Sequence, residues 1–226
     1  MSNNYKETSD KYDRELLKIH IPFHVERLKE AFYEEKYKID TRPSENIKNE
    51  RTINFPYEPT PYTFLEYLFS KYPFVSGDHF VDFGCGKGRA LLMASEYFCP
   101  LITGYEINND TFCILEKNID SYKKTSKTSS EFILINEDAS KVDIEDTMNK
   151  FNFYNPFHLK VYIKVINSII ESLKRKQRKV YIFLFMPHRT TLQYIEQATK
   201  FHLLESAPTK EDYNLLLYAV LTNDHK

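Results

Sequence analysis

Short apolar segments alternate with helical patterns from residue 79 onward, and this alternation limits the fold more than any other feature of the sequence. Strands that alternate with helices form parallel βαβ units, so an α/β fold is expected. The expected order is strand 79–83, helix 89–98, strand 101–106, helix 109–122, strand 131–136, a strand in 150–155, a helix with apolar positions from 161 to 173, the apolar strand RKVYIFLFM and a helix over 190–199.

The end of the chain differs from this alternation. Two apolar segments are joined by a short polar turn in FHLLESAPTKEDYNLLLYAVL, a pattern that predicts an antiparallel hairpin. Added to five strand–helix units, the hairpin gives a doubly wound, seven-stranded and mostly parallel sheet whose last strand is antiparallel.

The beginning of the chain has a helical pattern of its own. Residues 11–39 read as helix interrupted near Pro22, because proline ends or kinks a helix. After the proline, apolar side chains recur among charged neighbours, as in an amphipathic surface helix. The apolar face is expected to hold Val25, Leu28, Phe32 and Ile39.

A polar stretch with four prolines, residues 41–61, separates this helix from the alternating region. It is interpreted as a linker that ends where Thr60 caps a helix and Pro61 occupies the first helical position. The expected organisation is a helical extension and linker in residues 1–55 and an α/β domain in residues 56–226.

Composition restricts the classes of partner. The 226 residues include 31 basic and 32 acidic ones, so a net charge of -1 gives no electrostatic case for a nucleic-acid or membrane partner. Three cysteines are too few for a disulfide framework, and no His/Cys cluster suggests a metal site. The longest apolar run is far too short to span a bilayer. A soluble, cytoplasmic protein is expected.

All five glycines lie between residues 77 and 104, and three of them fall in FVDFGCGKGRALL, residues 80–92. The glycine turn, residues 84–88, follows the first strand, where the amides of a βα turn are free to bind a ligand. Its spacing is DxGxGxG, beginning at Asp82, and Arg89 occupies the third glycine position of the dinucleotide fingerprint. An acid before the turn would repel a pyrophosphate but suits an ammonium group, which disfavours a nicotinamide dinucleotide.

The turn resembles the first motif of the class I S-adenosyl-L-methionine (SAM)-dependent methyltransferases, in which an acid precedes GxGxG after the first strand. Asp82, Gly84, Gly86 and Gly88 match this motif residue by residue, and the resemblance covers about residues 56 to 221. It implies a Rossmann-like domain with SAM as the cofactor.

Further positions match the family at the next two strand ends. By resemblance, Glu106 accepts hydrogen bonds from the ribose hydroxyls, Ile107 packs against the adenine, Asp138 accepts from the adenine amino group and the Ala139 amide donates to the ring. Glu106 or Asp138 taken singly would more often be a solvated loop acid, and only the joint spacing favours a site.

The fourth strand end reads FYNPFH, residues 153–158. In methyltransferases that act on exocyclic or side-chain amines, this place carries an Asn or Asp, two prolines and an aromatic residue. Asn155, Pro156 and Phe157 resemble that motif with one proline fewer, and the resemblance makes them the candidate catalytic residues. The alternative is structural, with Asn155 as a helix cap and Pro156 in the first turn.

Secondary candidates lie on either side of these motifs. Tyr57, Thr60 and Tyr62 precede the first strand and are candidates to cover the cofactor, with a cap and core aromatics as the alternative. His188 follows the fifth strand and is a candidate base, with a solvated loop histidine as the alternative. Arg89 is expected on a helix surface.

The function predicted from these residues is methyl transfer from SAM, most favourably to an amino nitrogen of a nucleic-acid base or a protein side chain. The alternatives are a small-molecule methyltransferase and a non-catalytic module that binds SAM or a protein partner. A nicotinamide oxidoreductase is disfavoured by Asp82 and Arg89. The sequence leaves the methyl acceptor and the oligomeric state open.

Overall fold

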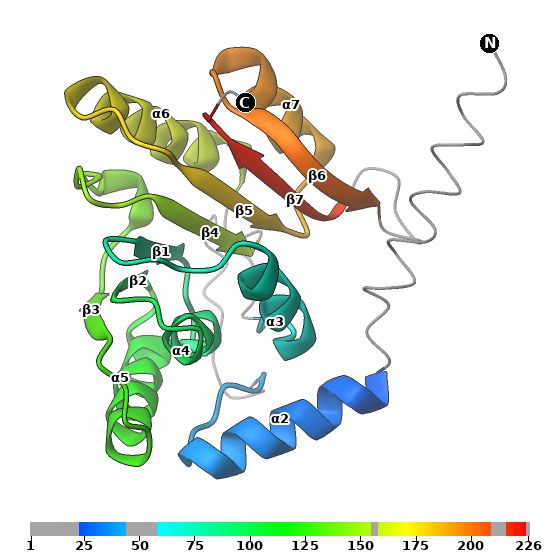
Figure 1. The fold of residues 1–226 in the computed structure, drawn as a ribbon, viewed down its shortest axis with the longest axis vertical. Helices are drawn as coiled ribbons and strands as arrows, with labels where there is room; N and C mark the ends of the chain where they lie inside the picture. Colours follow the sequence, from blue (N-terminus) through cyan, green and yellow to red (C-terminus); the bar gives the residue numbers. More distant parts are fainter. Residues whose placement is uncertain (1–22, 44–57, 155–157, 209–215, 225–226) are drawn as a thin grey trace, which may run out of the picture.

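A computed structural model describes residues 23–43, 58–154, 158–208 and 216–224, which form one seven-stranded sheet flanked by helices (Figure 1). The strand order is β3-β2-β1-β4-β5-β7-β6, and β7 runs antiparallel to both of its neighbours while the other pairs are parallel. The strands are β1 His79–Phe83, β2 Leu101–Tyr105, β3 Glu131–Ile135, β4 Lys150–Tyr154, β5 Tyr181–Phe185, β6 His202–Pro208 and β7 Leu216–Thr222. The predicted mostly parallel sheet with its C-terminal hairpin is confirmed.

The helices lie close to the predicted ranges. The helix predicted over 89–98 stops two residues early, because Phe98 adopts a positive φ of 63° and starts the turn into β2, and the helix predicted over 109–122 continues for three residues more. The described helices are α2 Phe23–Tyr37, α3 Tyr62–Lys71, α4 Arg89–Glu96, α5 Asn109–Thr125, the 3-10 turn η1 Ala139–Lys141, α6 Leu159–Arg175 and α7 Arg189–Ala198. Throughout the described part of the chain, every helix is too short or too polar to cross a membrane.

Each face of the sheet has its own apolar core. Phe80 and Ile102 point to the side of α3, α4 and α5, whereas Val81 and Phe83 point to the side of α6 and α7. Figure 1 shows these two groups of helices on opposite sides of the sheet. Strand β1 is buried along its whole length, as a central strand covered on both faces should be. This double cover makes the fold doubly wound.

The strand order reverses at β1, which pairs with β2 on one side and with β4 on the other. In open α/β sheets, ligands bind beyond the carboxyl ends of the strands at such a reversal. The glycine turn follows β1 directly, so it lies at the place where this fold forms binding sites.

Helix α2 lies outside α3, α4 and α5 as an additional layer (Figure 1). The predicted apolar face is wrong at Leu28, which is 69% exposed, and at Phe32, which is 57% exposed, whereas Ile39 just beyond the helix is buried. The helix instead turns an acidic face inward, and Glu30 and Glu34 on this face are buried. Burial of an acidic face requires cations or hydrogen-bond donors opposite it.

The start of α3 also differs from the prediction. The helix begins at Tyr62, and Pro61 stands at the cap position without a side-chain cap of its own. Glu26 of α2 supplies the cap, because its carboxylate accepts from the amides of Tyr62 at 2.6 Å and Thr63 at 3.1 Å. A negative charge is favourable at a helix N-terminus. The predicted boundary between residues 55 and 56 lies outside the described residues.

Candidate functional site

The glycine turn connects β1 to α4 through left-handed backbone. Gly88 has a φ of 92° and caps α4, and a Cβ atom added there would lie 2.5 Å from Leu115 Cδ1 of α5. Glycine is therefore required at 88 by the backbone conformation and by the close approach of a neighbouring helix. The amides of Gly84 and Cys85 both donate to the Tyr105 carbonyl at 2.9 Å, which fixes the turn against the end of β2.

Asp82 is buried on β1, directly before the turn. Its Oδ1 accepts a hydrogen bond of 2.8 Å from Asn152 Nδ2 on the adjacent strand β4. Burial raises the pKa of Asp82 to about 7, the bond from Asn152 opposes the rise, and the charge of Glu106 adds to it. A cationic ligand group would favour the ionised carboxylate, so this position fits the ammonium end of an amino-acid ligand.

Glu106 follows β2 and turns back onto the glycine turn. Its Oε2 accepts from the Gly86 amide at 3.0 Å, and its Oε1 accepts from the Asn108 amide at 2.8 Å. Burial raises the pKa of Glu106, and these backbone donors oppose the rise. Two carboxylates from adjacent strand ends thus meet at one turn.

Next to Asp82 and Glu106, hydrogen bonds from Asn136 connect the end of β3 to the end of β2. Asn136 Nδ2 donates to the carbonyls of Glu106 at 2.8 Å and Ile107 at 3.3 Å, and the Ile107 side chain is 48% exposed. Asp138 Oδ1 accepts from the Ser140 amide at 2.8 Å and caps η1, in which Ala139 is buried. These residues lie along the same edge of the sheet as the turn, and their roles toward a ligand stay predictions.

The predicted acceptor residues Asn155, Pro156 and Phe157 lie outside the described residues, as does Tyr57. The structure adds Tyr154 at the end of β4, whose hydroxyl donates to Glu58 Oε2 at 3.1 Å. This bond connects the segment before α3 to the strand end that precedes the acceptor motif.

His188 lies on the same edge of the sheet, exposed and at the cap of α7. Its carbonyl oxygen accepts from the amides of Thr191 and Leu192, so its place in the chain is set by the start of the helix. A contact between its imidazole and a methyl acceptor stays a prediction.

Tyr62 adopts the structural alternative of a core aromatic residue, whereas Thr60 does not take the cap position of α3. Tyr62 is 1% exposed beneath α2, where its hydroxyl donates to Glu34 at 3.2 Å. Thr60 is also buried, and its carbonyl accepts from Arg89 Nη1 at 3.4 Å. Tyr62 is thus a core aromatic residue and is too enclosed to cover a ligand.

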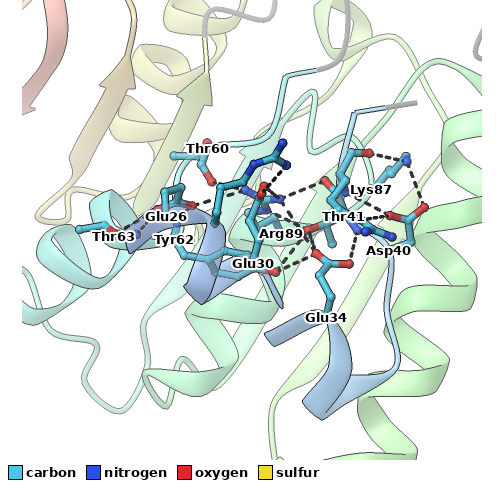
Figure 2. Close-up of polar contacts among 12 residues, drawn as sticks. Glu26, Glu30, Glu34, Asp40, Thr41, Thr60, Tyr62, Thr63, Lys87 and Arg89 are labelled. Atoms are coloured by element: carbon cyan, nitrogen blue, oxygen red, sulfur yellow. Dashed lines mark hydrogen bonds and ion pairs between the residues drawn. The ribbon is translucent and has the colours of Figure 1, made fainter. Parts of the chain in front are cut away.

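Arg89 is buried, in contrast to the helix-surface position expected for it (Figure 2). Its Nη2 contacts Glu30 Oε1 at 2.8 Å, and its Nε donates to Thr41 Oγ1 at 2.8 Å. The guanidinium also lies 4.3 Å from the centre of the Tyr62 ring. We refer to Arg89, Glu26, Glu30, Glu34, Thr41 and Tyr62 as the Arg89 cluster.

Two signals in the sequence point to the residues that sequence reasoning missed. Glu26, Glu30 and Glu34 have the spacing of one helix face, and like charges four residues apart destabilise a helix unless a cation lies opposite. Asn152 is a polar residue between two phenylalanines of a buried strand, where it needs a hydrogen-bond partner. Both patterns identify a buried polar contact without naming the partner.

Solved structures of methyltransferases share this fold. A putative RNA methyltransferase from Pyrococcus horikoshii has a TM-score of 0.52 and 16% sequence identity over 83% of this chain and 90% of its own. Magnesium protoporphyrin IX methyltransferase from Synechocystis, with bound SAM, has a TM-score of 0.50 and 11% identity over 72% of this chain and 77% of its own. A ribosomal protein L11 methylase from Lactobacillus delbrueckii has a TM-score of 0.50 and 15% identity over 70% of this chain and 75% of its own.

No protein-family model matches the sequence, and no curated protein matches it. At identities of 11% to 16%, the structural likeness establishes the fold. The chain has the Rossmann-like fold of the class I SAM-dependent methyltransferases.

Proposed function

We propose that the protein is a SAM-dependent methyltransferase. The observation that carries the proposal is the meeting of two carboxyl groups, the buried Asp82 and the half-buried Glu106, at a glycine turn on the carboxyl edge of the sheet. A pyrophosphate would be repelled by this pair, whereas a ligand with an ammonium group and a ribose diol matches it. The shared fold with methyltransferase structures supports the same ligand class.

The proposed cofactor contacts follow the sequence motifs. Asp82 would hold the ammonium group, and Glu106 would accept from the ribose hydroxyls while it keeps its bond to the Gly86 amide. Ile107, Asp138 and Ala139 would surround the adenine. When bound, SAM supplies a methyl group that is activated by its attachment to a sulfonium sulfur. The protein then has to hold the acceptor lone pair in line with that group.

The proposed acceptor is an amino nitrogen of a nucleic-acid base or a protein side chain. Asn155, Pro156 and Phe157 would bind it directly after β4, with the Asn155 side-chain oxygen accepting from the amino group and Phe157 stacking on a planar acceptor. In this proposal residues 56–226 form the catalytic domain, and the N-terminal extension contributes to specificity. A small-molecule acceptor is the second possibility within the same reaction.

Cofactor binding is tested by calorimetry with S-adenosylhomocysteine, the demethylated product. Saturable binding is expected, and Glu106→Gln should weaken it about tenfold or more, because the ribose loses a charged acceptor. Glu116→Gln, an exposed glutamate on α5, is the matched control and should bind as wild type does. Absence of binding would exclude both the enzyme and a SAM-binding module, and saturable NADH binding would favour an oxidoreductase instead.

Catalysis is tested by release of S-adenosylhomocysteine from SAM in the presence of separate nucleic-acid, protein and small-molecule pools. Turnover with one pool identifies the acceptor class, and Asn155→Ala should abolish that turnover without a change in cofactor affinity. Tight binding of SAM with no turnover on any pool would favour the non-catalytic module.

A further inference from the structure

The two basic residues of the glycine-turn region, Lys87 and Arg89, both point to residues 23–43, which we call the N-terminal segment (Figure 2). Lys87 lies within the turn, and Arg89 is the first residue of the helix that follows it. Both side chains are buried. The turn thus has the candidate cofactor position on one side and the N-terminal segment on the other.

Arg89 is held mainly by the N-terminal segment. Its guanidinium lies 2.8 Å from Glu30, 3.7 Å from Glu26 and 4.0 Å from Glu34, all on the inner face of α2. Thr41 adds an acceptor at 2.8 Å, and the same hydroxyl donates to Glu34 at 2.5 Å. The direction of the Arg89 side chain therefore depends on α2 and Thr41 being in place.

The turn backbone is tied to the same segment. Lys87 Nζ donates to the Arg42 carbonyl at 2.6 Å. Asn118 of α5 donates to the Lys87 carbonyl at 3.0 Å and to the Asp40 carbonyl at 3.0 Å, and it accepts from the Asp40 amide at 3.0 Å. One buried asparagine thus joins the backbone of the turn to the backbone of the N-terminal segment.

We propose that the N-terminal segment positions the glycine turn, so that docking of α2 and binding of SAM at the turn stabilise each other. The inference rests on the proposed function, since it requires a ligand at the turn. Gly86 and Glu106 hold the turn on the ligand side, and Lys87 and Arg89 hold it on the opposite side. A ligand that prefers the ordered turn must stabilise the docked segment by the same factor by which the segment improves binding.

Thr41 allows a test that leaves the ligand side untouched. Thr41→Val keeps the shape of the side chain but removes the hydroxyl between Arg89 and Glu34, and Thr41→Ser keeps the hydroxyl. We expect Thr41→Val to weaken S-adenosylhomocysteine binding about tenfold in calorimetry of the folded protein, within the range common for coupled sites. Thr41→Ser should restore wild-type affinity. Wild-type affinity in a folded Thr41→Val protein would overturn the proposal.

A control variant separates this coupling from general loosening of α2. Lys29→Met removes the ion pair of 2.5 Å between Lys29 and Glu66, which joins α2 to α3 away from the glycine turn. This partly exposed pair contributes little to stability. Lys29→Met should bind S-adenosylhomocysteine as wild type does, and an equal loss in Lys29→Met and Thr41→Val would overturn a specific role of the Arg89 cluster.

Hydrogen exchange provides the reciprocal measurement on the wild-type protein, which requires no variant to fold. Saturating S-adenosylhomocysteine should slow amide exchange in residues 23–43, and the slowing should be smaller in Thr41→Val. Binding without a change in exchange of this segment overturns the coupling and leaves the proposed function standing. Absence of binding overturns both.

Discussion

Arg89 at the carboxyl end of the sheet and Lys150 at the amino end are both buried cations, and their partners have different origins. Lys150 Nζ contacts Asp78 at 2.9 Å and the carbonyls of Tyr72 and Pro73 at 3.1 Å and 2.7 Å. These partners belong to the short connection between α3 and β1, inside the α/β domain. The partners of Arg89 come mainly from the N-terminal segment.

This difference shows which of the two buried cations is neutralised from within the α/β domain. At the amino end of the sheet, the domain itself supplies the counter-charge of Lys150. At the carboxyl end, where the candidate site lies, the counter-charges of Arg89 come from residues that precede the domain. A buried charge without its partner is costly, so a chain shortened to the α/β region would leave Arg89 uncompensated. The N-terminal segment is therefore part of the folded unit, even though the βαβ topology does not require it.

The largest expected effect compares the two cations directly. Arg89→Met leaves the carboxylates of α2 without their cation, and we expect it to lower the free energy of unfolding by about 5 kcal/mol. Lys150→Met should cost less, about 3 kcal/mol, because Asp78 keeps hydrogen bonds from Asn149 and the Val75 amide. Urea denaturation of both variants measures the order, and an equal or larger loss for Lys150→Met would contradict it.

The next largest effect is a difference in the pH dependence of stability between Asp82, at the carboxyl end of the sheet, and His79, at the amino end. Burial raises the pKa of Asp82 to about 7, above a value of about 4 in the unfolded chain. The contribution of Asp82 to the free energy of unfolding is therefore complete below pH 4 and is lost as the pH rises to 7. Burial lowers the pKa of His79 to about 4, below a value of about 6.5 in the unfolded chain. The contribution of His79 to the free energy of unfolding is therefore lost as the pH falls from about 6.5 to about 4.

Variants at these two positions should show opposite slopes. As the pH is raised from 4 to 7, the free energy of unfolding of Asp82→Asn should rise by about 3 kcal/mol relative to wild type. Over the same rise in pH, that of His79→Gln should fall by about 2 kcal/mol relative to wild type. Urea denaturation at several pH values measures both differences. Slopes of the same sign would show that burial does not dominate at one of the two ends.

Two glycines with almost the same backbone conformation give a smaller effect. Gly77, near the amino end, has a φ of 90° and no atom within 4 Å of an added Cβ, whereas Gly88 has a φ of 92° and Leu115 Cδ1 at 2.5 Å. Gly77→Ala should cost about 1 kcal/mol from backbone strain, and Gly88→Ala about 2 to 3 kcal/mol because the methyl group also meets α5. Thermal melts compare them, and equal costs would show that α5 adjusts freely.

The smallest effect is expected on the outer face of α2. Leu28→Gln should change the free energy of unfolding by less than about 0.5 kcal/mol, because this side chain is 69% exposed. A loss above about 1 kcal/mol in the same denaturation assay would indicate that the outer face, rather than the Arg89 cluster, holds the helix.

These contrasts also explain how far the sequence could predict the fold. The sheet followed from its apolar strands, because HFVDF and YIFLF sit between polar turns and burial on both faces leaves few other arrangements. Asp82 and Glu106 could be paired because the carboxyl ends of adjacent parallel strands must meet. For these elements, spacing along the chain determines proximity in space.

The buried face of the N-terminal helix could not be predicted in the same way. Its inner face is held by ion pairs, and a charged residue in a helical pattern normally indicates solvent. The sequence also does not show whether Arg89 is buried or exposed. That depends on its partners, and one of them, Glu30, lies 59 residues earlier in the chain. The acceptor residues Asn155, Pro156 and Phe157 stay predictions.

The cap of α3 has a consequence for the order in which the chain folds. Glu26 is synthesised 36 residues before Tyr62, whose amide it caps, and Glu30 precedes Arg89 by 59 residues. The glutamates of α2 therefore remain hydrated until both later helices have left the ribosome. We therefore expect α2 to dock after α3 and α4 have formed, in which case changes in the Arg89 cluster should accelerate unfolding more than they slow folding.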